Sequence, residues 1–380
     1  MNMGNCLCKM CGNVLPKHSL LHFHDMPKAA QFLPDAHDLA ADAGVDLVIY
    51  QCTSCGLVQS SSEPVAYYKE VVRAAAFSEE MQAFRQVQFA QFVQDYALQG
   101  KNLIEIGCGR GEYLRLLQSA GVMAYGLEYG ADSVRQCVAA GLDVTPGYID
   151  SAEYVLEHAP FDAFAVLNFM EHWPDPNASL RGIANNLVEG GIGLVEVPNL
   201  DMILKNNLFT EFISDHILYF TRESLVTMLR LNGFEVLSCA EVWHGYILSA
   251  VVRKRKFCDV SAFASSRLQI KSEVGCFIQQ HAAEGVAIWG AGHQALAAIA
   301  LLGLAKEIKY VVDSAPFKQG KFTPASHIPI VAPAYLTEHP VGAVIVMAAS
   351  YSDEVANIIR RDWPAVTHVA ILRDFGLEFV

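Results

Sequence analysis

The sequence has no long apolar run and no excess of positive charge. It contains no stretch of about 18 uninterrupted apolar residues and no apolar signal-peptide core near its first residue. Its 380 residues include 27 Lys and Arg against 40 Asp and Glu, which gives a net charge of −13 at pH 7. Proteins that bind nucleic-acid phosphates usually have a basic surface, whereas this composition is acidic. We therefore expect a cytoplasmic protein with no membrane contact and no nucleic-acid partner.

Disulfides are not expected either, although ten cysteines are present. In a reducing compartment, clustered cysteines are better interpreted as metal ligands. Two C-x2-C-G units occupy residues 8–12 and 52–56, and the glycine of each allows the tight turn that directs two thiolates at one ion. A zinc ion with four thiolates has no open position for water, so we predict a structural zinc. Its predicted ligands are Cys8, Cys11, Cys52 and Cys55.

Other interpretations of these cysteines stay open. Cys6 is an alternative to Cys8, because it precedes the first unit by only two residues. Less probable substitutes for a thiolate are the nearby histidines His18, His22 and His24. Four unliganded buried thiols are the remaining interpretation.

The chain is organised around residues 102–129. An apolar run over 103–106 predicts a buried strand, a glycine turn follows at 107–111, and apolar residues over 113–117 have helical spacing. A second strand is predicted over 123–127, and Glu128 ends it. Such a strand, turn, helix and strand unit lets a ligand approach the backbone closely at the turn.

The spacing of the glycines decides between two kinds of ligand. A dinucleotide fingerprint, G-x-G-x-x-G, would need its third glycine at position 112, where the chain has Glu112. The pattern from Glu105 to Gly111 is E-x-G-x-G-x-G, which resembles motif I of the class I S-adenosylmethionine (SAM) methyltransferases. A glycine turn that binds no ligand is the remaining interpretation.

The resemblance implies roles for the residues of this turn. In that family the acid before the glycines, here Glu105, orients the amino-acid end of SAM. The acid that ends the second strand, here Glu128, accepts both ribose hydroxyls, since a carboxylate offers two acceptor oxygens to two neighbouring donors. The implied cofactor-binding residues are Glu105, Gly107, Gly109, Gly111 and Glu128.

Two later segments continue the resemblance. The run 162–167 predicts a strand, and N-F-M-E-H-W-P-D-P follows from Asn168. This segment resembles the E-H-x-x-D-P stretch of many small-molecule methyltransferases, where the strand end covers the methionine part of SAM, so Asn168 is a further implied cofactor contact. Residues 186–199 resemble the helix end and fifth strand of the same fold. His172 is expected to hold its loop, with a catalytic base as the alternative.

Residues 60–100 connect the cysteine units to the glycine turn. Apolar residues over 84–93 have helical spacing and predict a helix that packs on the next domain. In SAM enzymes this segment often folds over the cofactor as a lid. Tyr67, Tyr68 and Ser78 are therefore secondary candidates for the site.

A closer resemblance emerges at residues 212–221. Zinc knuckles, a SAM domain and this segment together resemble the three-domain sugar C-methyltransferases that act on nucleotide-linked 4-keto-deoxysugars. Those enzymes carry Y-x-E-H, with the histidine proposed as the base that takes the proton beside the ketone. Here Asp215 and His216 keep the acid and the histidine, whereas Ile213 replaces the tyrosine. A later H-G-G-S segment appears only as His244-Gly245-Tyr246.

Elementary chemistry supports a base at His216. Forming a carbon–carbon bond from SAM needs a carbanion equivalent, so a proton must leave a carbon next to a carbonyl. An imidazole with an ordinary pKa of about 6.5 accepts a proton at neutral pH, and an adjacent carboxylate would orient it. Because neighbouring side chains on a strand face opposite ways, a contact between Asp215 and His216 requires a loop. A structural histidine is the alternative.

The last part of the chain predicts a second doubly wound unit, with strands over 286–289, 308–312, 343–347 and 368–372. Gly290-x-Gly292-x-x-Ala295 followed by Asp313 nearly satisfies the NAD fingerprint. However, residues 313–330 resemble the D-x-x-P-x-K-Q-G stretch of the same methyltransferases, whose C-terminal domain holds no dinucleotide and helps enclose the substrate. Lys318 and Lys321 suit a substrate diphosphate, with solvated surface lysines as the alternative.

These patterns predict an α/β protein in which a class I SAM methyltransferase sheet follows a small zinc-binding domain and precedes a Rossmann-like domain. The predicted boundaries are 1–65 for zinc binding, 66–256 for the methyltransferase domain with N-terminal lid helices, and 257–380 for the substrate domain. The implied activity is C-methylation beside a ketone of a nucleotide-linked deoxysugar, with His216 and Asp215 as catalytic residues. Alternatives are an O- or N-methyltransferase, an NAD-linked oxidoreductase, and a non-enzymatic zinc and SAM binding module. The oligomeric state stays open.

Overall fold

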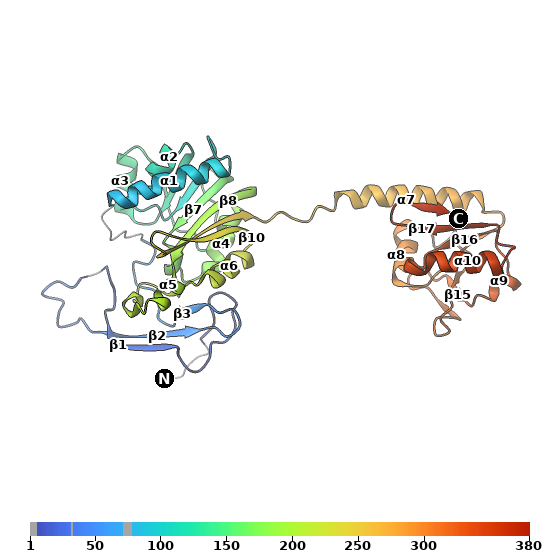
Figure 1. Cartoon of the computed structure of the whole chain (residues 1–380), viewed down its shortest axis with the longest axis horizontal. Coiled ribbons are helices and arrows are strands. Elements are labelled where there is room, and N and C mark those ends of the chain that lie inside the picture. The colour runs from blue at the N-terminus through green and yellow to red at the C-terminus, as the bar shows by residue number, and fades with distance from the viewer. Residues whose placement is uncertain (1–5, 32, 71–77) are drawn as a thin grey trace. The chain divides into compact units, whose positions relative to one another are not determined.

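The computed structural model describes residues 6–31, 33–70 and 78–380. The chain divides into two compact units, Met1–Lys256 and Phe257–Val380 (Figure 1). The further division of the first unit at residue 65 stays a prediction. None of the helices in the described ranges combines the length and the apolar character that crossing a bilayer needs.

A small antiparallel sheet begins the first unit. Its strand order is β1-β2-β3-β9, with bounds β1 Leu21–Met26, β2 Val45–Gln51, β3 Val58–Ser60 and β9 Leu218–Tyr219. Val58 pairs with Tyr219 and Gln59 with Leu218. The sheet built mainly from the first sixty residues therefore takes its last strand from the segment directly after His216.

The large sheet of the first unit has the order β10-β11-β8-β7-β4-β5-β6. The five strands from β8 to β6 are parallel, and β11 and β10 add an antiparallel edge. The bounds are β4 Asn102–Ile106, β5 Met123–Glu128, β6 Asp143–Pro146, β7 Phe161–Leu167, β8 Leu187–Pro198, β10 Phe234–Val242 and β11 Ile247–Lys254. This arrangement confirms the predicted doubly wound α/β sheet.

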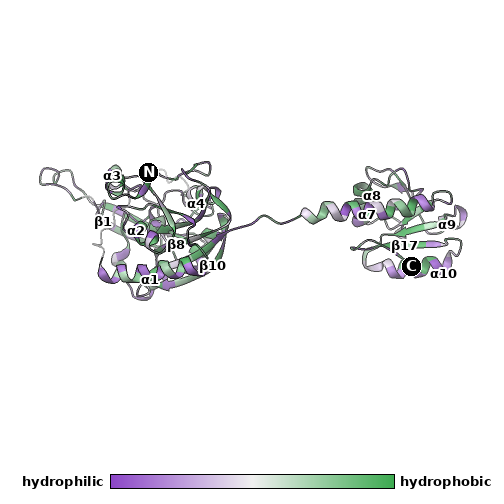
Figure 2. Cartoon of the chain, turned by 90° about the horizontal axis from the view of Figure 1, so that it is seen from above, coloured by the Kyte–Doolittle hydropathy of each residue, from purple (hydrophilic) through white to green (hydrophobic). Residues whose placement is uncertain are grey.

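Helices cover both faces of this sheet, and an apolar core fills each face. Figure 1 shows α1, α2 and α3 together on one face. Figure 2 shows that α1 carries both polar and apolar residues, as expected for a helix with one side on a sheet. The bounds are α1 Glu79–Asp95, α2 Glu112–Ser119, α3 Ala131–Ala139, α4 Pro176–Asn185, α5 Leu200–Lys205 and α6 Arg222–Leu231, with short 3₁₀ turns at Met170–His172 and Phe209–Glu211.

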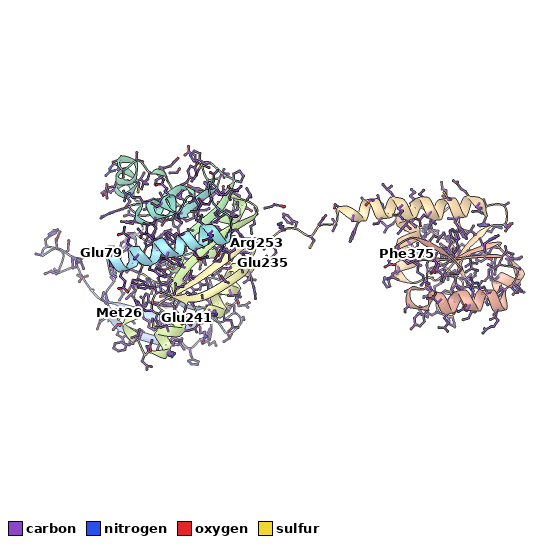
Figure 3. The ribbon with its side chains drawn as sticks, turned by 45° about the horizontal axis from the view of Figure 1, so that its top comes forward. Met26, Glu79, Glu235, Glu241, Arg253 and Phe375 are labelled. Carbon is purple, nitrogen blue, oxygen red and sulfur yellow. The ribbon has the colours of Figure 1, made fainter. Side chains whose placement is uncertain are left out.

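Local sequence signals explain where these elements begin. Ser78 starts α1 because its side chain accepts the backbone N–H of Met81, and Glu79 follows in the first turn (Figure 3). Ser78 is thus a helix cap in this structure. On the antiparallel edge, Glu235 of β10 and Arg253 of β11 are cross-strand partners and form a 3.7 Å ion pair (Figure 3).

The second unit is a separate α/β sheet with the order β14-β15-β13-β12-β16-β17-β18. Its strand bounds are β12 Val286–Trp289, β13 Val311–Val312, β14 Lys321–Phe322, β15 Pro329–Val331, β16 Ala343–Val346, β17 His368–Leu372 and β18 Leu377–Phe379. Its helix bounds are α7 Ser261–Gln280, α8 His293–Leu302, α9 Tyr335–Glu338 and α10 Ser352–Asp362, with a 3₁₀ turn at Ala349–Tyr351. Apolar cores lie on both faces, which confirms the additional α/β domain.

Candidate functional site

The glycine turn lies at the carboxyl end of β4. Gly107, Gly109 and Gly111 have φ of +72°, +58° and +79°, a region that glycine enters without steric cost. A Cβ at Gly111 would overlap the side chain of Leu142. The three glycines therefore allow a backbone conformation that other residues would adopt only with strain. This conformation places main-chain groups at the strand ends, where α/β sheets bind ligands.

Two buried carboxylates flank this turn. Glu105 lies on β4 and Glu128 ends β5, and their side chains are 0% and 1% exposed. Glu128 Oε2 accepts the N–H of Gly109 at 2.9 Å, and its Oε1 accepts the N–H of Gly130 at 2.8 Å. Glu128 therefore ties the end of β5 to the glycine turn.

A narrow pocket opens beside the turn, at the ends of β4, β5 and β6. It is lined by Gly107 and by the aromatic residues Tyr129, Tyr148 and Phe169. Lys69 also lines it, and its Nζ lies 5.0 Å from the ring centroid of Tyr148 and 5.3 Å from that of Tyr129. Burial raises the pKa of Tyr148, so its phenol stays protonated. The pocket thus combines flat apolar walls with a cation at its edge.

Buried polar atoms without partners gather at the same strand ends. Asn168 follows β7 with a φ of +50°, and its Oδ1 is buried without a hydrogen-bond partner. The Tyr148 hydroxyl is also buried without a hydrogen-bond partner. Native structures rarely leave such groups unpaired, and strained backbone often marks a functional site. The donors and acceptors that SAM carries would satisfy these atoms, so the residues present fit that cofactor.

The predicted catalytic pair lies on the loop before β9, but Asp215 and His216 are not partners there. Asp215 Oδ1 accepts the N–H of Ala30 at 2.7 Å, and its Oδ2 accepts the hydroxyl of Tyr67 at 2.7 Å. The two residues do lie on a loop, as a direct contact would require, but the Asp215 carboxylate contacts two donors from distant segments of the chain. Asp215 fastens the loop to the N-terminal part of the chain.

His216 instead faces another histidine. The rings of His172 and His216 are 4.9 Å apart and nearly perpendicular. His172 Nδ1 donates to the backbone carbonyl of Asp215 at 2.8 Å, because a carbonyl can only accept. This bond fixes the His172 tautomer and leaves its Nε2 as an acceptor. Burial, with a smaller contribution from His172, lowers the pKa of His216 to about 3. His216 is thus a neutral base at pH 7.

Glu171 adds a third ionisable group that sequence analysis did not single out. It is 2% exposed, and burial raises its pKa to about 8, so it is mainly protonated at pH 7. Ligand-type atoms of Glu171, His172 and His216 all lie within 4.8 Å of one another. The E-H pair in the sequence was the available signal for this cluster.

An apolar cavity of about 580 Å³ lies next to the histidine loop. Its walls include Phe23 and Met26 on one side and Phe209 and Ile213 on the other. The Ser214 hydroxyl donates to Pro27 O at 2.7 Å and joins the two walls. Ile213, which replaces the tyrosine of the resembling family, thus gives this cavity an apolar side.

The four predicted metal ligands converge. Sulfur atoms of Cys8, Cys11, Cys52 and Cys55 lie within 4.8 Å of one another, and two pairs are 3.4 and 3.6 Å apart. Zn–S bonds of about 2.3 Å in a tetrahedron would separate sulfurs by about 3.8 Å, so the geometry fits zinc. Cys6 is exposed and outside the group, which favours Cys8.

The glycine turn of the second unit, which follows β12, has a different backbone conformation and different neighbours. Gly290 has a φ of +120°, whereas Gly292 has an ordinary φ of −83°. Asp313 Oδ2 accepts both the N–H of Ala291 and the ammonium of Lys318, each at 2.8 Å. A cavity of about 300 Å³ adjoins this turn, and Lys318 lines it. Lys321 is exposed on β14.

Comparison with known proteins gives two domain matches. Residues 81–239 match the model of a methyltransferase domain, and residues 254–364 match that of a C-methyltransferase C-terminal domain. The C-methyltransferase NovU of Streptomyces niveus is 25% identical over 384 residues, which cover 92% of this chain and 90% of that protein.

Two further matches cover the middle of the chain. A ubiquinone biosynthesis O-methyltransferase of Methylococcus capsulatus is 31% identical over 135 residues, which cover 34% of this chain and 56% of that protein. Among solved structures, the PH0226 protein of Pyrococcus horikoshii covers 51% of this chain and 100% of its own, with 14% identity and a TM-score of 0.41.

Proposed function

Because this chain belongs to the SAM-dependent methyltransferases and carries a C-methyltransferase C-terminal domain, we propose that it methylates carbon next to the ketone of a nucleotide-linked deoxysugar. The observation that carries the proposal is the neutral, half-buried imidazole of His216, whose ring lies 4.9 Å from that of His172 on a loop of the unit that contains the glycine turn. C-methylation needs a base for a carbon-bound proton, and a neutral imidazole can take it.

The cofactor would be held at the glycine turn. Glu128 would accept the ribose hydroxyls, and Glu105 and Asn168 would contact the amino-acid part. When bound, SAM supplies an electrophilic methyl group. The residues of the turn fix its position relative to the acceptor, which is a large part of catalysis when two reactants must meet in line.

His216 would remove the proton beside the ketone. The C–H bond would break, an N–H bond would form on the imidazole, and the electron pair would stay on the acceptor as an enolate. Bound SAM would supply the methyl group to that carbon, with its C–S bonding pair returning to sulfur so that S-adenosylhomocysteine leaves. A buried imidazolium is unfavourable by itself, as the pKa of His216 near 3 indicates. The negative charge that develops on the enolate beside it offsets this cost. His172 and Asp215 would hold the loop in position.

The apolar cavity next to Ile213 suits the acceptor. A deoxysugar lacks some hydroxyls and carries a methyl group, so part of its surface prefers apolar walls.

Zinc would be a structural component of the same protein. Cys8, Cys11, Cys52 and Cys55 would hold it with a full set of thiolates, and its contribution would be to folding. No step of the reaction is assigned to it.

The deciding experiment uses isotopic labels. The protein is incubated with labelled SAM and a panel of nucleotide-linked keto-sugars deuterated beside the ketone. Carbon methylation transfers the label and releases one deuterium for each methyl group. Methyl transfer with full retention of deuterium would instead identify an O- or N-methyltransferase, the second candidate, which the O-methyltransferase match favours. No transfer to any acceptor would overturn both.

A further inference from the structure

Two histidines and an aspartate meet on one face of the small antiparallel sheet. β1 is the edge strand of this sheet and pairs with β2 (Figure 1). His22 and His24 are two residues apart on β1, so their side chains point to the same face. Asp46 is the second residue of β2. All three side chains are exposed, and none of them belongs to the four-cysteine group.

The other face of the sheet explains why these side chains point outward. Leu21 and Phe23, which alternate with the histidines on β1, pack against an apolar core. Leu47, which follows Asp46 on β2, is fully buried in the same core. Because successive side chains of a strand face opposite ways, the apolar residues go to the core and the imidazoles and the carboxylate stay on the solvent side.

A bulge in β1 lies next to this group. The register of β1 on β2 shifts between Phe23 and Met26, so His24 and Asp25 together oppose the single residue Asp46. Asp25 has a φ of +53°, which marks the irregular position. Bulges bend a strand and change the direction of its side chains, and they are frequent beside functional sites.

The distances match those between ligands of one metal ion. His22 Nε2 and His24 Nδ1 donate to different oxygens of Asp46, each at 3.0 Å. Ligand-type atoms of the three residues all lie within 4.8 Å of one another. Two metal–ligand bonds of about 2.1 Å at right angles separate their ligand atoms by about 3.0 Å. An ion would take the place of the two bridging hydrogen atoms if each imidazole moved its proton to its other ring nitrogen.

We propose that His22, His24 and Asp46 bind a divalent transition-metal ion such as Ni²⁺, Cu²⁺ or Zn²⁺. Imidazole nitrogens suit these ions, and the carboxylate adds oxygen ligands and a negative charge. Ca²⁺ and Mg²⁺ prefer a shell of oxygen ligands, which two histidines do not supply. Three residues leave other coordination positions to water, so this ion would exchange with solution more readily than one enclosed by four thiolates.

A hydrogen-bonded surface group without a metal makes a different prediction. An exposed histidine beside a carboxylate is common and contributes little to stability. The chain offers such a case in His37, which is exposed and lies 3.5 Å from Asp38. Among the described residues, the group around His37 contains no second histidine. If convergence of two imidazoles makes the site, replacing His37 should have no effect on metal binding.

The test titrates Ni²⁺ into the untagged full chain by calorimetry, after incubation with Zn²⁺ and dialysis, at a pH above the ordinary imidazole pKa of about 6.5. In His22→Gln and His24→Gln, the affinity of one binding equivalent should fall at least about 100-fold, because even hydrogen-bond partners of metal ligands contribute about 10 to 100-fold. Asp46→Asn should weaken the same equivalent. His37→Gln is the matched control and should leave it unchanged. The difference between variants decides, since other described residues also bring ligand-type atoms together.

Three outcomes would overturn the inference. Unchanged Ni²⁺ binding in both histidine variants would leave the three residues as a hydrogen-bonded surface group. No heat with the unaltered protein would show that the group binds no such ion. An equal loss in His37→Gln would show that any exposed imidazole is sufficient. Circular dichroism checks that each variant folds, which we expect because the three side chains are exposed. None of these results depends on methyl transfer, so this inference and the proposed function fail independently.

Discussion

The two glycine turns of this molecule have similar sequences and different structures. Both follow a parallel strand, precede a helix, and are contacted by the acid that ends the next strand. In the first unit, Gly107, Gly109 and Gly111 all have positive φ. In the second unit only Gly290 does, and Gly292 has an ordinary φ. The first turn thus requires glycine at three positions, whereas the second turn requires it only at Gly290.

Each turn is held by its acid. Glu128 accepts the N–H groups of Gly109 and Gly130, and Asp313 accepts those of Ala291 and Ala315. Asp313 also accepts the ammonium of Lys318. A ribose hydroxyl would have to share Asp313 with a charged donor that is already 2.8 Å away. The contact of Asp313 with Lys318 is thus the physical argument against the NAD alternative at the second turn.

The largest expected effect concerns the proposed zinc of the first unit. Cys52→Ala removes one of the four convergent thiols and should lower the unfolding temperature of the first unit by roughly 10 °C or more, since a structural zinc contributes several kcal/mol. Cys258→Ala, an exposed cysteine of the second unit, is the control. Differential scanning calorimetry with bound-zinc analysis measures both. Equal stability of Cys52→Ala and the unaltered protein would contradict a structural metal.

The next effect tests where the reaction takes place. His216→Asn should lower kcat by about 10² to 10⁴-fold, the usual contribution of a general base. The control is His281→Asn, which changes a buried histidine of the second unit and should alter kcat less than threefold. Steady-state rates with labelled SAM measure both. Near-full turnover in His216→Asn would remove that residue from the catalytic role.

The third test compares the two acids directly. Glu128→Gln should raise the dissociation constant of S-adenosylhomocysteine by about 10 to 100-fold, because hydroxyls lose a charged acceptor. Asp313→Asn should change it less than twofold. Calorimetry gives the constants, and NADH fluorescence is recorded in parallel. NADH binding that Asp313→Asn abolishes would reverse the comparison and favour the oxidoreductase alternative.

The smallest effect is a pH dependence of stability in the first unit. The pKa of His216 is lowered from its ordinary value of 6.5 to about 3, so between these values the unfolded chain binds the proton and the folded chain does not. The contribution of His216 to the free energy of unfolding is therefore fully present above pH 6.5 and is lost as the pH falls toward 3. The loss is at most tenfold in the folding equilibrium constant for each pH unit. His216→Asn should flatten this slope in urea titrations. An unchanged slope would show that His216 is solvated.

Features of the fold that depend on short-range spacing of residues could be predicted from the sequence. The glycine turn, the strands around it and the acid at the end of β5 all follow from short-range spacing, and the α/β class is confirmed. The cysteine spacing identified two knuckles but left Cys6 and Cys8 open, because both precede Cys11 at plausible distances. Only the fold separates them, since Cys8 lies in the group of four converging thiols and Cys6 is exposed outside it.

What the sequence could not predict depends on contacts between distant segments. Asp215 appeared to serve its neighbour His216, but its carboxylate bonds to Ala30 and Tyr67, which are far away in the chain. Arg85 lies among Gln and Glu residues of α1, so its neighbours in the sequence suggest a surface cation. Its burial comes from Glu196 and Tyr113, which lie on other elements.

The pairing of β3 with β9 has a consequence for how this protein would fail in a cell. Val58 and Gln59 lie just after the second cysteine knuckle, and their partners Tyr219 and Leu218 lie just after His216. Loosening of the four-cysteine group would therefore be passed to His216, the proposed base, through backbone hydrogen bonds. The glycine turn belongs to another sheet and would keep its shape. We therefore expect that loss of the proposed zinc or oxidation of its thiols would lower turnover more than it lowers cofactor binding.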